Sequence, residues 1–559
     1  MASNESNKLR IIVVGGGIAG LAAAAVLRQR HEVLVYERDP ASAPERGAGL
    51  GIGPNGSRML KKAFHFRPEH VKATVCAGSR TYDKEGNLVR EMTGVTEPFG
   101  GEWLLMHRTD LRNELLRLAT GDAAKLGISG PPATVVNGVE VTGIDVEEGM
   151  VRLDNGDEVF ADVIVGADGI HSLVRQAIVG EPSHFLSTGV SLYRFTFPLT
   201  RAREILKGYP AAIDPSNGGF FNVMTADDDT NRNIIFYSCR DLATLNVVAR
   251  VPDSMLSIES MTSWNAEANP EEMLDHFFDF APWILDIMKH VEDVHLYKVK
   301  DTAPLPTYTR GRALVVGDAA HPMTPFQGQG ATQAIEDAEG LRLLLHDGVD
   351  SENVDNVDRA LRTWDSVRRP RAAQVQQNSR HVTDMSAQAQ LDRMRLNWTY
   401  GGIHAALRNR ALRLQPALRP SALRPAHRTA RRTYAVKEPA RDTPAYHGGD
   451  QPPPAGSNEK APTKSDQVRN KGTLYSIVGV AVTVGAFFAF LTGSPDRAAG
   501  VIENSTRGKG ESSAFVGYGS KPSSERHLEE TTGRDPLRQS GLAGLKSEQT
   551  DPNQPSTRN

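Results

Sequence analysis

Three short apolar runs, each followed at once by glycine, stand out in the pattern of hydrophobic and polar positions. They occupy 11–14, 163–165 and 313–316. Uninterrupted apolar runs of this length are typical of strands covered on both faces in a parallel sheet. An alanine-rich helical stretch at 21–27 and another apolar strand at 32–37 follow the first run, which is the order of a βαβ unit. The pattern therefore predicts an α/β fold built on a Rossmann-like sheet.

Alternating apolar and polar positions, typical of strands with one exposed face, mark the stretches 72–106 and 184–300. These stretches interrupt the buried strands, so they predict a β-sheet substrate domain inserted into a discontinuous first domain. The first domain then consists of 8–71, 107–183 and 301–345. A C-terminal helical segment is expected at 346–402, with one helix from about 355 to 400.

The first strand leads into a glycine fingerprint, Gly15-x-Gly17-x-x-Gly20. In this strand–turn–helix context, Gly15 allows a tight turn, Gly17 lets the backbone approach a pyrophosphate and Gly20 lets the helix pack closely. Free N–H groups at the helix start then bind the pyrophosphate. Glu37 ends the next strand, where a ribose hydroxyl needs an acceptor. We therefore expect a bound dinucleotide; an ordinary crossover with a glycine-rich turn is the alternative.

The composition changes after residue 402. In 403–472, Lys and Arg outnumber Asp and Glu by fourteen to five, and Pro and Ala are frequent, which predicts a disordered or weakly helical linker. The stretch 473–493 is uncharged, and about 18 residues of helix span about 27 Å, so it predicts one transmembrane helix. A buried core helix is the alternative. A polar, disordered tail is expected at 494–559.

The charge balance and the cysteine content restrict the class of protein. The 559-residue chain has a formal net charge of −3, which gives no indication of nucleic-acid binding. Its 2 cysteines form no CxxC motif, which excludes a disulfide framework and a Cys-rich metal site and fits a reducing compartment. The N-terminus lacks the apolar segment of a signal peptide.

Further motifs follow the other two buried runs, and another lies in the late helical segment. They are Gly166-Ala167-Asp168-Gly169 with Ser172 and Arg175, Gly317-Asp318-Ala319-Ala320-His321-Pro322, and Trp364 with Arg368-Arg369-Pro370-Arg371. Taken in this order with the glycine fingerprint, they resemble the motifs of single-component (group A) flavin monooxygenases, which include salicylate hydroxylase and para-hydroxybenzoate hydroxylase. The resemblance covers about 8–400 and is greatest for fungal enzymes of secondary metabolism.

The resemblance implies FAD as the bound cofactor and NAD(P)H as the co-substrate. Beside the glycine fingerprint, it assigns FAD contacts to Glu37, Gly51, Arg108, Asp318 and Ala331. Gly49 and Gly53 flank Gly51 and are alternatives to it. Asp168 resembles the residue of a motif that serves both cofactors. The sequence has no second glycine fingerprint, so NAD(P)H would have no Rossmann domain of its own.

The residues themselves support some of these assignments. Asp318 follows a strand at the carboxyl edge of the predicted sheet, where ligands bind in open α/β sheets; a helix N-cap is the alternative. Ala331 lies at the start of a helix whose N–H groups would face the flavin edge on which negative charge develops. For Arg108 the alternative is an ordinary surface arginine.

Two polar residues in apolar strands are the candidates for catalysis. Arg194 stands in an otherwise apolar strand, so it must be paired or must serve a ligand. Tyr237 lies in a neighbouring strand, and the two together could hold and deprotonate a phenol, as the Arg and Tyr of similar fungal hydroxylases do. A buried ion pair and a packed aromatic ring are the alternatives. His321 belongs to the family motif, which gives it no proton-transfer role.

The sequence thus predicts an FAD-dependent monooxygenase that uses NAD(P)H and O₂ to hydroxylate an aromatic or phenolic small molecule in secondary metabolism. An epoxidase of a prenylated, hydrophobic metabolite is one alternative. A membrane-tethered flavoprotein with a binding or scaffold role is an alternative of another class. The apolar span and the basic linker predict a single-pass membrane protein with its catalytic domain in the cytosol.

Overall fold

A six-stranded sheet is the centre of the first half of the fold. The computed structural model describes residues 7–43, 47–182, 184–257, 265–380 and 386–414. The strand order is β18-β19-β11-β1-β2-β7, and every neighbouring pair is parallel except β18 with β19. The strands are β1 (Arg10–Val14), β2 (Glu32–Glu37), β7 (Thr134–Asn137), β11 (Val163–Gly166), β18 (Thr309–Arg310) and β19 (Ala313–Val315).

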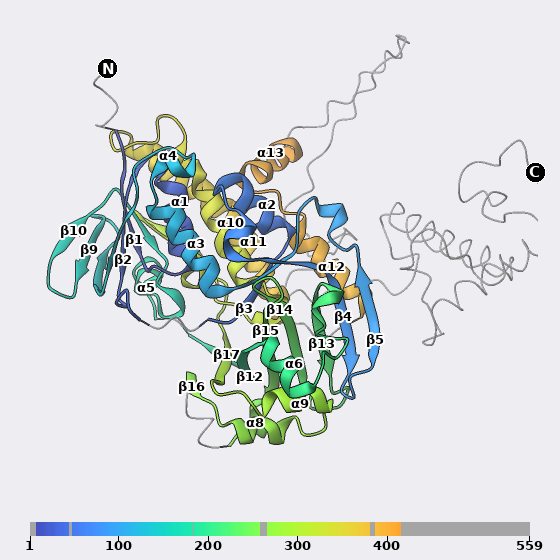
Figure 1. Ribbon diagram of the computed structural model, residues 1–559. Helices are drawn as coiled ribbons and strands as arrows, with labels where there is room; N and C mark the ends of the chain where they lie inside the picture. The colour runs from blue at the N-terminus through green and yellow to red at the C-terminus, as the bar shows by residue number, and fades with distance from the viewer. Residues whose placement is uncertain (1–6, 44–46, 183, 258–264, 381–385, 415–559) are drawn as a thin grey trace, which may run out of the picture. The chain divides into compact units, whose positions relative to one another are not determined.

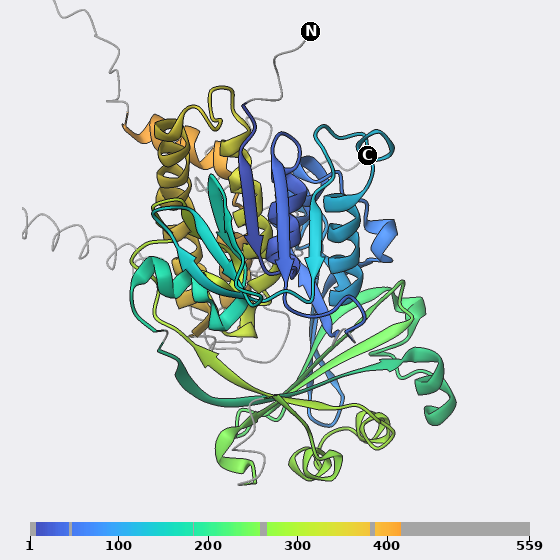
Figure 2. The same ribbon diagram turned by 90° about the vertical axis from the view of Figure 1, so that its left-hand side faces the viewer.

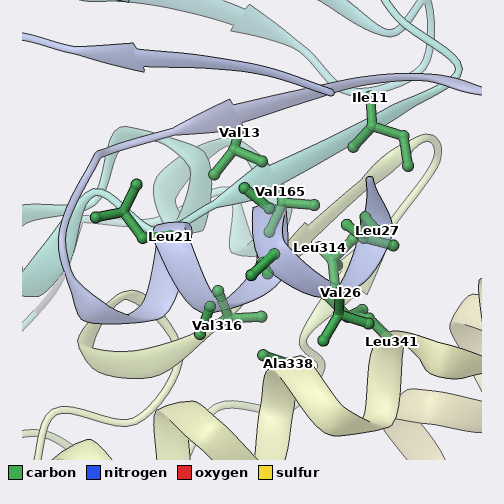
Figure 3. Packing of buried hydrophobic residues seen from close by; sticks show 14 of the residues in the cluster. Ile11, Val13, Leu21, Val26, Leu27, Val165, Leu314, Val316, Ala338 and Leu341 are labelled. Carbon is green, nitrogen blue, oxygen red and sulfur yellow. The ribbon is translucent and has the colours of Figure 1, made fainter. Parts of the chain in front are cut away.

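Helix α1 (Ile18–Leu27) packs its small side chains between this sheet and helix α10 (Gly330–Gly340). The side chains that fill the space are fully buried, and Figure 3 shows Val13, Val165 and Leu314 facing α1. Each buried aliphatic side chain contributes about 1.5–3 kcal/mol through removal of apolar surface from water. Helix α3 (Arg108–Thr120) packs beside α1, as Figure 1 shows.

A three-stranded antiparallel sheet forms a small appendage to the parallel sheet. Its strands are β8 (Val141–Asp145), β9 (Met150–Leu153) and β10 (Glu158–Phe160), in the order β10-β9-β8. The tight turn between β9 and β10 contains Asn155 and Gly156, and Gly156 has a φ of +88°. Positive φ is the reason that glycine is favoured in hairpin turns of this kind.

A second large sheet combines both insertions predicted from the alternating pattern. Its order is β16-β17-β12-β15-β14-β13-β4-β6-β3, with β5 on the edge of β4. The first insertion joins the second through the parallel pair of β4 and β13. The strands are β3 (Gly49–Ile52), β4 (Thr74–Asp83), β5 (Leu88–Thr93), β6 (Leu104–His107), β12 (Leu186–Pro198), β13 (Gly219–Thr225), β14 (Asn233–Cys239), β15 (Thr244–Pro252), β16 (Asn265–Glu267) and β17 (His295–Asp301).

The two faces of this sheet have different neighbours. On β12, Tyr193 and Phe195 belong to an apolar cluster with helices α6 (Leu199–Leu206), α8 (Pro270–His276) and α9 (Pro282–Met288). Because successive side chains of a strand point to opposite faces, Arg194 points the other way. Figure 2 shows α8 and α9, in yellow-green, on the side of the sheet remote from the parallel sheet. The face that carries Arg194 is therefore left for the site between the two sheets.

The C-terminal helices are α11 (Val354–Arg380), α12 (Ala387–Trp398) and α13 (Ile403–Leu414). The single helix predicted to about residue 400 is therefore wrong. The side chain of Ser386 caps a new helix, α12, whose Trp398 is buried against Trp103 and Phe99. The first 12 residues of the predicted linker form α13, because Ile403 is buried in the main core.

The α/β fold with a Rossmann-like sheet and a second sheet is confirmed for the described residues. The predicted transmembrane helix at 473–493 and the tail at 494–559 lie outside those residues, as does the linker from 415 onward. Within the part of the chain that the structure describes, no helix is both long enough and apolar enough to cross a membrane.

Candidate functional site

A cleft of about 780 Å³ lies between the carboxyl ends of the parallel strands and the inner face of the second sheet. This volume lies within the range of about 300–1,000 Å³ that is usual for small-molecule sites. All of the predicted site residues line the cleft except Gly20: Gly15, Gly17, Glu37, Gly51, Arg108, Asp168, Arg194, Tyr237, Asp318 and Ala331. Residues from three separate strand ends, at Gly17, Asp168 and Asp318, therefore share one cavity.

The glycine turn between β1 and α1 has room for a side chain at one of its glycines, and at two others a side chain would clash with the backbone. A Cβ at Gly15, whose φ is +105°, would lie 2.4 Å from the carbonyl oxygen of Ala167. A Cβ at Gly20 would lie 1.9 Å from the carbonyl oxygen of Gly15, so this residue serves helix packing and not the cleft. At Gly17 a Cβ would meet nothing within 4 Å. Gly17 therefore borders space that a ligand can occupy.

Both helix starts at the cleft lack a side-chain cap. Helix α1 has Gly17 as its N-cap and α10 has Gln329, and neither helix has an acidic residue in its first turn. Uncapped N–H groups and the helix dipole favour an anion or a developing negative charge. Ala331 lies in the first turn of α10, as the sequence predicts.

Two of the predicted carboxylates are already engaged by the protein. Glu37 accepts hydrogen bonds from the backbone N–H groups of Gly16, at 2.6 Å, and Asp39, at 2.9 Å. These bonds fix its carboxylate beside the glycine turn. Asp168 accepts from the hydroxyl of Ser172, at 2.5 Å, and from the N–H of Leu173, at 2.7 Å. Burial raises the pKa of Asp168, and these hydrogen bonds oppose that effect.

Asp168 therefore stabilises the start of helix α5 (Leu173–Val179), and its predicted contact with a cofactor stays a prediction. Arg175 of the same helix donates to the carbonyl oxygens of Asp318, at 3.2 Å, and Ala319, at 2.9 Å. The Asp168 turn and the Asp318 turn are thus held together by Arg175.

Asp318 and Arg108 have free side chains in the cleft. Neither side chain forms a hydrogen bond or an ion pair with the residues that the structure describes, and both residues are open to the cleft that they line. The surrounding protein raises the pKa of Asp318 by desolvation, against the opposing influence of His321, Arg108 and Arg175. A carboxylate without a partner at this position is suited to accept a hydrogen bond from a ligand hydroxyl.

The glycines around Gly51 differ in their surroundings. A Cβ at Gly49 would lie 2.6 Å from the side chain of Asn246, and one at Gly53 would lie 2.3 Å from that of Trp398. At Gly51 the nearest atom, Nε1 of Trp103, would be 3.2 Å away. Gly49 and Gly53 are thus required for packing within the protein, whereas Gly51 has more room on its cleft side.

His321 lies behind the cleft and does not line it. Its Nε2 is 2.6 Å from Oδ2 of Asp337, and both side chains are fully buried. Asp337 also accepts from Arg368 Nε, at 2.9 Å, and Arg368 NH1 donates to Glu336 at 2.5 Å. This buried network joins the His321 motif, α10 and α11. It explains why the Arg368 segment belongs with the cofactor motifs, although Glu336 and Asp337 carried no signal of their own.

Arg194 and Tyr237 line the other end of the cleft, on β12 and β14. The prediction that their strands are neighbours is wrong, because β15 pairs with both strands and lies between them. The Nε of Arg194 is buried without a hydrogen-bond partner, and within the described residues its guanidinium forms no ion pair. The guanidinium lies 5.3 Å from the ring centroid of Tyr297. The alternative of a buried ion pair is therefore wrong, and the need for a ligand remains.

Tyr237 is 5% exposed, and its ring stacks on Phe221 with 5.7 Å between centroids. Burial raises the pKa of its hydroxyl, and the charge of Arg194 opposes that effect. The hydroxyl is therefore protonated near neutral pH and is a hydrogen-bond donor. The alternative interpretation, a packed aromatic ring, agrees with the stacking on Phe221. It does not exclude a role in the site, because the same residue lines the cleft.

Some of the residues that line the cleft were not predicted from the sequence. Trp103 and Trp398 line the cleft with 5.4 Å between their rings, although they are far apart in the sequence. Arg250 also lines it from β15. The signal for Arg250 was available, since it stands between Ala249 and Val251 in an apolar strand, as Arg194 does.

Known proteins resemble the chain in sequence and in structure. It matches the FAD binding domain family over 286–379 and the NAD(P)-binding Rossmann-like domain family over 13–42. Hispidin-3-hydroxylase of Neonothopanus nambi is 32% identical over 388 residues, which cover 66% of this chain and 87% of that protein. The salicylate hydroxylase of Pseudomonas putida is 30% identical over 395 residues, which cover 67% and 86%.

A solved structure of a salicylate hydroxylase substrate complex has a TM-score of 0.56 to this one at 25% identity, and the match covers 74% of this chain and 99% of that chain. The match to the NAD(P)-binding Rossmann-like domain contains the glycine turn, and the match to the FAD binding domain contains the Asp318 motif. The open space at Gly17, the uncapped helix starts and the free Asp318 and Arg108 side chains fit FAD in chemical character.

Proposed function

This chain belongs to the family of salicylate hydroxylase-like, FAD-dependent monooxygenases, and we propose that within this family it hydroxylates a small phenolic compound. FAD and NAD(P)H are the cofactor and the co-substrate of this family. We place the substrate among secondary metabolites, a role that the resemblance to fungal enzymes supports. The single observation that carries the phenolic assignment is the guanidinium of Arg194, which is unpaired in the cleft.

The described residues would hold FAD from several elements. The uncapped start of α1 at Gly17 would bind the pyrophosphate, and Glu37 would accept from a ribose hydroxyl. Asp318 and Arg108 would contact the ribityl and phosphate groups, and Ala331 at the start of α10 would lie at the flavin ring. When bound, FAD supplies the transfer of electrons from NAD(P)H to O₂ and of one oxygen atom to the substrate.

The chain's own contribution is to bind and activate the phenol. The positive charge of Arg194 lowers the pKa of a phenol beside it and so favours the phenolate. The protonated Tyr237 hydroxyl donates a hydrogen bond to the phenolate oxygen and orients it. A phenolate ring is richer in electrons than the neutral phenol, and therefore reacts more readily with an electrophilic oxygen.

The rest of the cleft suits a flat aromatic ring. Trp103, Phe221 and Tyr237 form a continuous wall, with 5.5 Å between the first two rings and 5.7 Å between the last two. Aromatic pairs at such spacings are favourable beyond their burial of apolar area. An uncharged prenylated substrate, as an epoxidase would require, would leave the Arg194 guanidinium desolvated without a partner, which is costly.

A turnover assay tests the proposal. The purified protein is expected to carry FAD and to oxidise NAD(P)H faster when a suitable phenol is present, with a product that is one oxygen atom heavier by mass spectrometry. A panel of simple phenols and their O-methyl ethers provides matched probes, since only the free phenols can form a phenolate. Equal stimulation and product formation by both groups would overturn the phenolic assignment, and a protein that retains no flavin would overturn the family-based mechanism.

A further inference from the structure

Two elements that the resemblance places at FAD are joined to each other. Strand β3 carries Gly51 and helix α3 begins at Arg108, and both residues line the cleft. The backbone N–H of Arg108 donates a hydrogen bond to the carbonyl oxygen of Ala48, at 2.9 Å, just before β3. A ligand that binds at either element therefore acts on one connected unit. We call this unit, residues 48–52 and 108–110, the β3–α3 junction.

The side chain of Asn246 fixes the β3–α3 junction to the substrate sheet. Asn246 is opposite Tyr237 on the antiparallel pair of β14 and β15, so the two side chains share one face of the sheet. Its Oδ1 accepts a hydrogen bond from the backbone N–H of Gly49, at 2.7 Å. A Cβ at Gly49 would lie 2.7 Å from the ring of Tyr237, so β3 packs directly on this tyrosine. Figure 1 shows β3 beside β14 and β15.

Asn246 is an unusual residue for its position. Asparagine is depleted in strands, and this one is completely buried. Its Nδ2 has no hydrogen-bond partner, which costs free energy at a buried position. Within the described residues, the side chain forms one hydrogen bond, the one from Gly49. The side chain is therefore best explained by this bond, which fixes the position of β3 on β14 and β15.

An ion pair forms a second link between the β3–α3 junction and the same two strands. Arg240 lies in the turn between β14 and β15 and donates through Nε and Nη2 to the two carboxylate oxygens of Asp110, at 2.7 and 2.8 Å. This bidentate geometry fixes the direction of the contact as well as its length. Asp110 is in the first turn of α3, two residues after Arg108.

The turn that carries Arg240 has an unfavourable backbone conformation. Arg240, Asp241 and Leu242 have φ values of +54°, +52° and +64°. Residues with a Cβ rarely adopt this left-handed conformation, and such strain persists only where the surrounding structure holds it. Here it is held by the ion pair with Asp110 and by the N–H of Asp241, which donates to the carbonyl oxygen of Lys72 at 2.9 Å. The order of this turn thus depends on its contacts with other elements, α3 among them.

We propose that Asn246 and the Asp110–Arg240 ion pair are positioning residues that couple FAD binding to the order of β14 and β15. FAD bound to the β3–α3 junction stabilises it, and the two links carry this stabilisation to the strand of Tyr237. Coupling between two sites is reciprocal, so a substrate held at Tyr237 also tightens the binding of FAD. The inference rests on the proposed placement of FAD and on no particular substrate.

Hydrogen–deuterium exchange of the protein with and without FAD tests this inference. In the wild type, FAD should slow exchange in the β3–α3 junction, and it should also slow exchange by about ten-fold in the segment 239–246, which spans the turn between β14 and β15. Asn246→Leu and Arg240→Gln should each reduce the effect on 239–246 and leave the effect on the junction. The double variant should bring exchange in 239–246 to within about two-fold of its FAD-free rate. Asn246→Asp keeps an acceptor for Gly49 and should keep the coupling.

Asn222→Leu is the matched control. Asn222 on β13 is also a buried asparagine of this sheet, but it is opposite Phe236, which faces the outer helices, and its Nδ2 donates to backbone carbonyl oxygens at 3.1 and 3.2 Å. This variant should lower the thermal midpoint and leave the effect of FAD on 239–246 unchanged. The thermal midpoint and the flavin content of each variant show whether it is folded.

Two results would overturn the inference while the placement of FAD stands. In one, FAD slows exchange in the β3–α3 junction of the wild type and not in 239–246. In the other, the folded double variant shows the same effect of FAD on 239–246 as the wild type. If FAD slows exchange in neither segment, the proposed placement of FAD is contradicted and the inference falls with it, so the two failures are distinguishable.

Discussion

The Nε2 of His321 lies 2.6 Å from Oδ2 of Asp337, and the two side chains are completely buried. The Asp337 oxygen also accepts from the backbone N–H of Gly317, at 2.9 Å, next to Asp318. His321 therefore acts on the turn that presents Asp318 to the cleft, and it has no access to a substrate. It is a positioning residue, although its place in a cofactor motif could suggest a role in proton transfer.

Replacement of His321 tests this assignment. His321→Ala should lower the free energy of unfolding by about 1–3 kcal/mol, because it removes a hydrogen bond from a buried carboxylate. His321→Gln, which keeps a donor, should recover part of the loss. Chemical denaturation measures both effects. Turnover per bound FAD should change by less than about three-fold, with an unaltered pH profile; a loss of about a hundred-fold at unchanged stability would show instead that His321 is catalytic.

Two glycine variants separate cofactor binding from folding. At Gly17 there is open space for a Cβ and φ is −77°, so Gly17→Ala should fold normally and bind FAD less tightly. At Gly20 a Cβ would lie 1.9 Å from the Gly15 carbonyl oxygen, so Gly20→Ala should destabilise the helix–sheet contact. Denaturation of the FAD-free proteins and fluorescence titration with FAD measure the two effects. Equal loss of stability in both variants would contradict the assigned roles.

Variants at the substrate end should affect turnover more than FAD content. Arg194→Gln should lower kcat/KM for a phenol by about a hundred-fold, equivalent to about 2.7 kcal/mol, because it removes the charge that favours the phenolate. Tyr237→Phe should cost about ten-fold, since it removes one hydrogen bond. With Arg194→Gln, the rising, low-pH limb of the rate profile should move to higher pH, because the pKa of the bound phenol is no longer lowered. Full activity of the Arg194 variant would contradict the phenolate mechanism.

The buried network predicts a specific response to acid. Burial alone would raise the pKa values of Glu336 and Asp337. Arg371 and Arg368 hold the pKa of Glu336 below its usual range, and His321 and Arg368 hold that of Asp337 below its usual range. Carboxylates with lowered pKa values in the folded protein stabilise it above their ordinary pKa of about 4, and this stability is lost as the pH falls further. We expect the free energy of unfolding to fall steeply below about pH 4.

Arg368→Met provides the comparison for the acid response. It should destabilise the protein by about 3–5 kcal/mol at pH 7, because it leaves buried carboxylates short of a partner. Protonation of the carboxylates relieves that penalty. The difference in the free energy of unfolding between the variant and the wild type should therefore become smaller as the pH falls. Denaturation curves between pH 7 and pH 3 measure it, and a constant difference would show that the network does not titrate as described.

The features that could be predicted from the sequence are those that depend only on residues close together along the chain. The buried strands, the glycine turn and the position of Asp318 at a strand end follow from short runs of residues, and Arg194 was visible as a charge in an apolar strand. Trp103 and Trp398 meet only after folding, and no local pattern pairs them. The partners of Arg368 and the break before α12 likewise depend on tertiary packing, which periodicity along one segment does not encode.

Three strand ends of the parallel sheet are expected to hold one FAD molecule opposite Arg194 and Tyr237. A crystal structure of the FAD-loaded enzyme would show this arrangement. It should show the pyrophosphate at the start of α1 beside Gly17 and the ribityl chain at Asp318. The flavin ring should lie between the start of α10 and the inner face of the substrate sheet. A flavin ring outside this cleft, with Arg194 and Tyr237 turned away from it, would contradict the account.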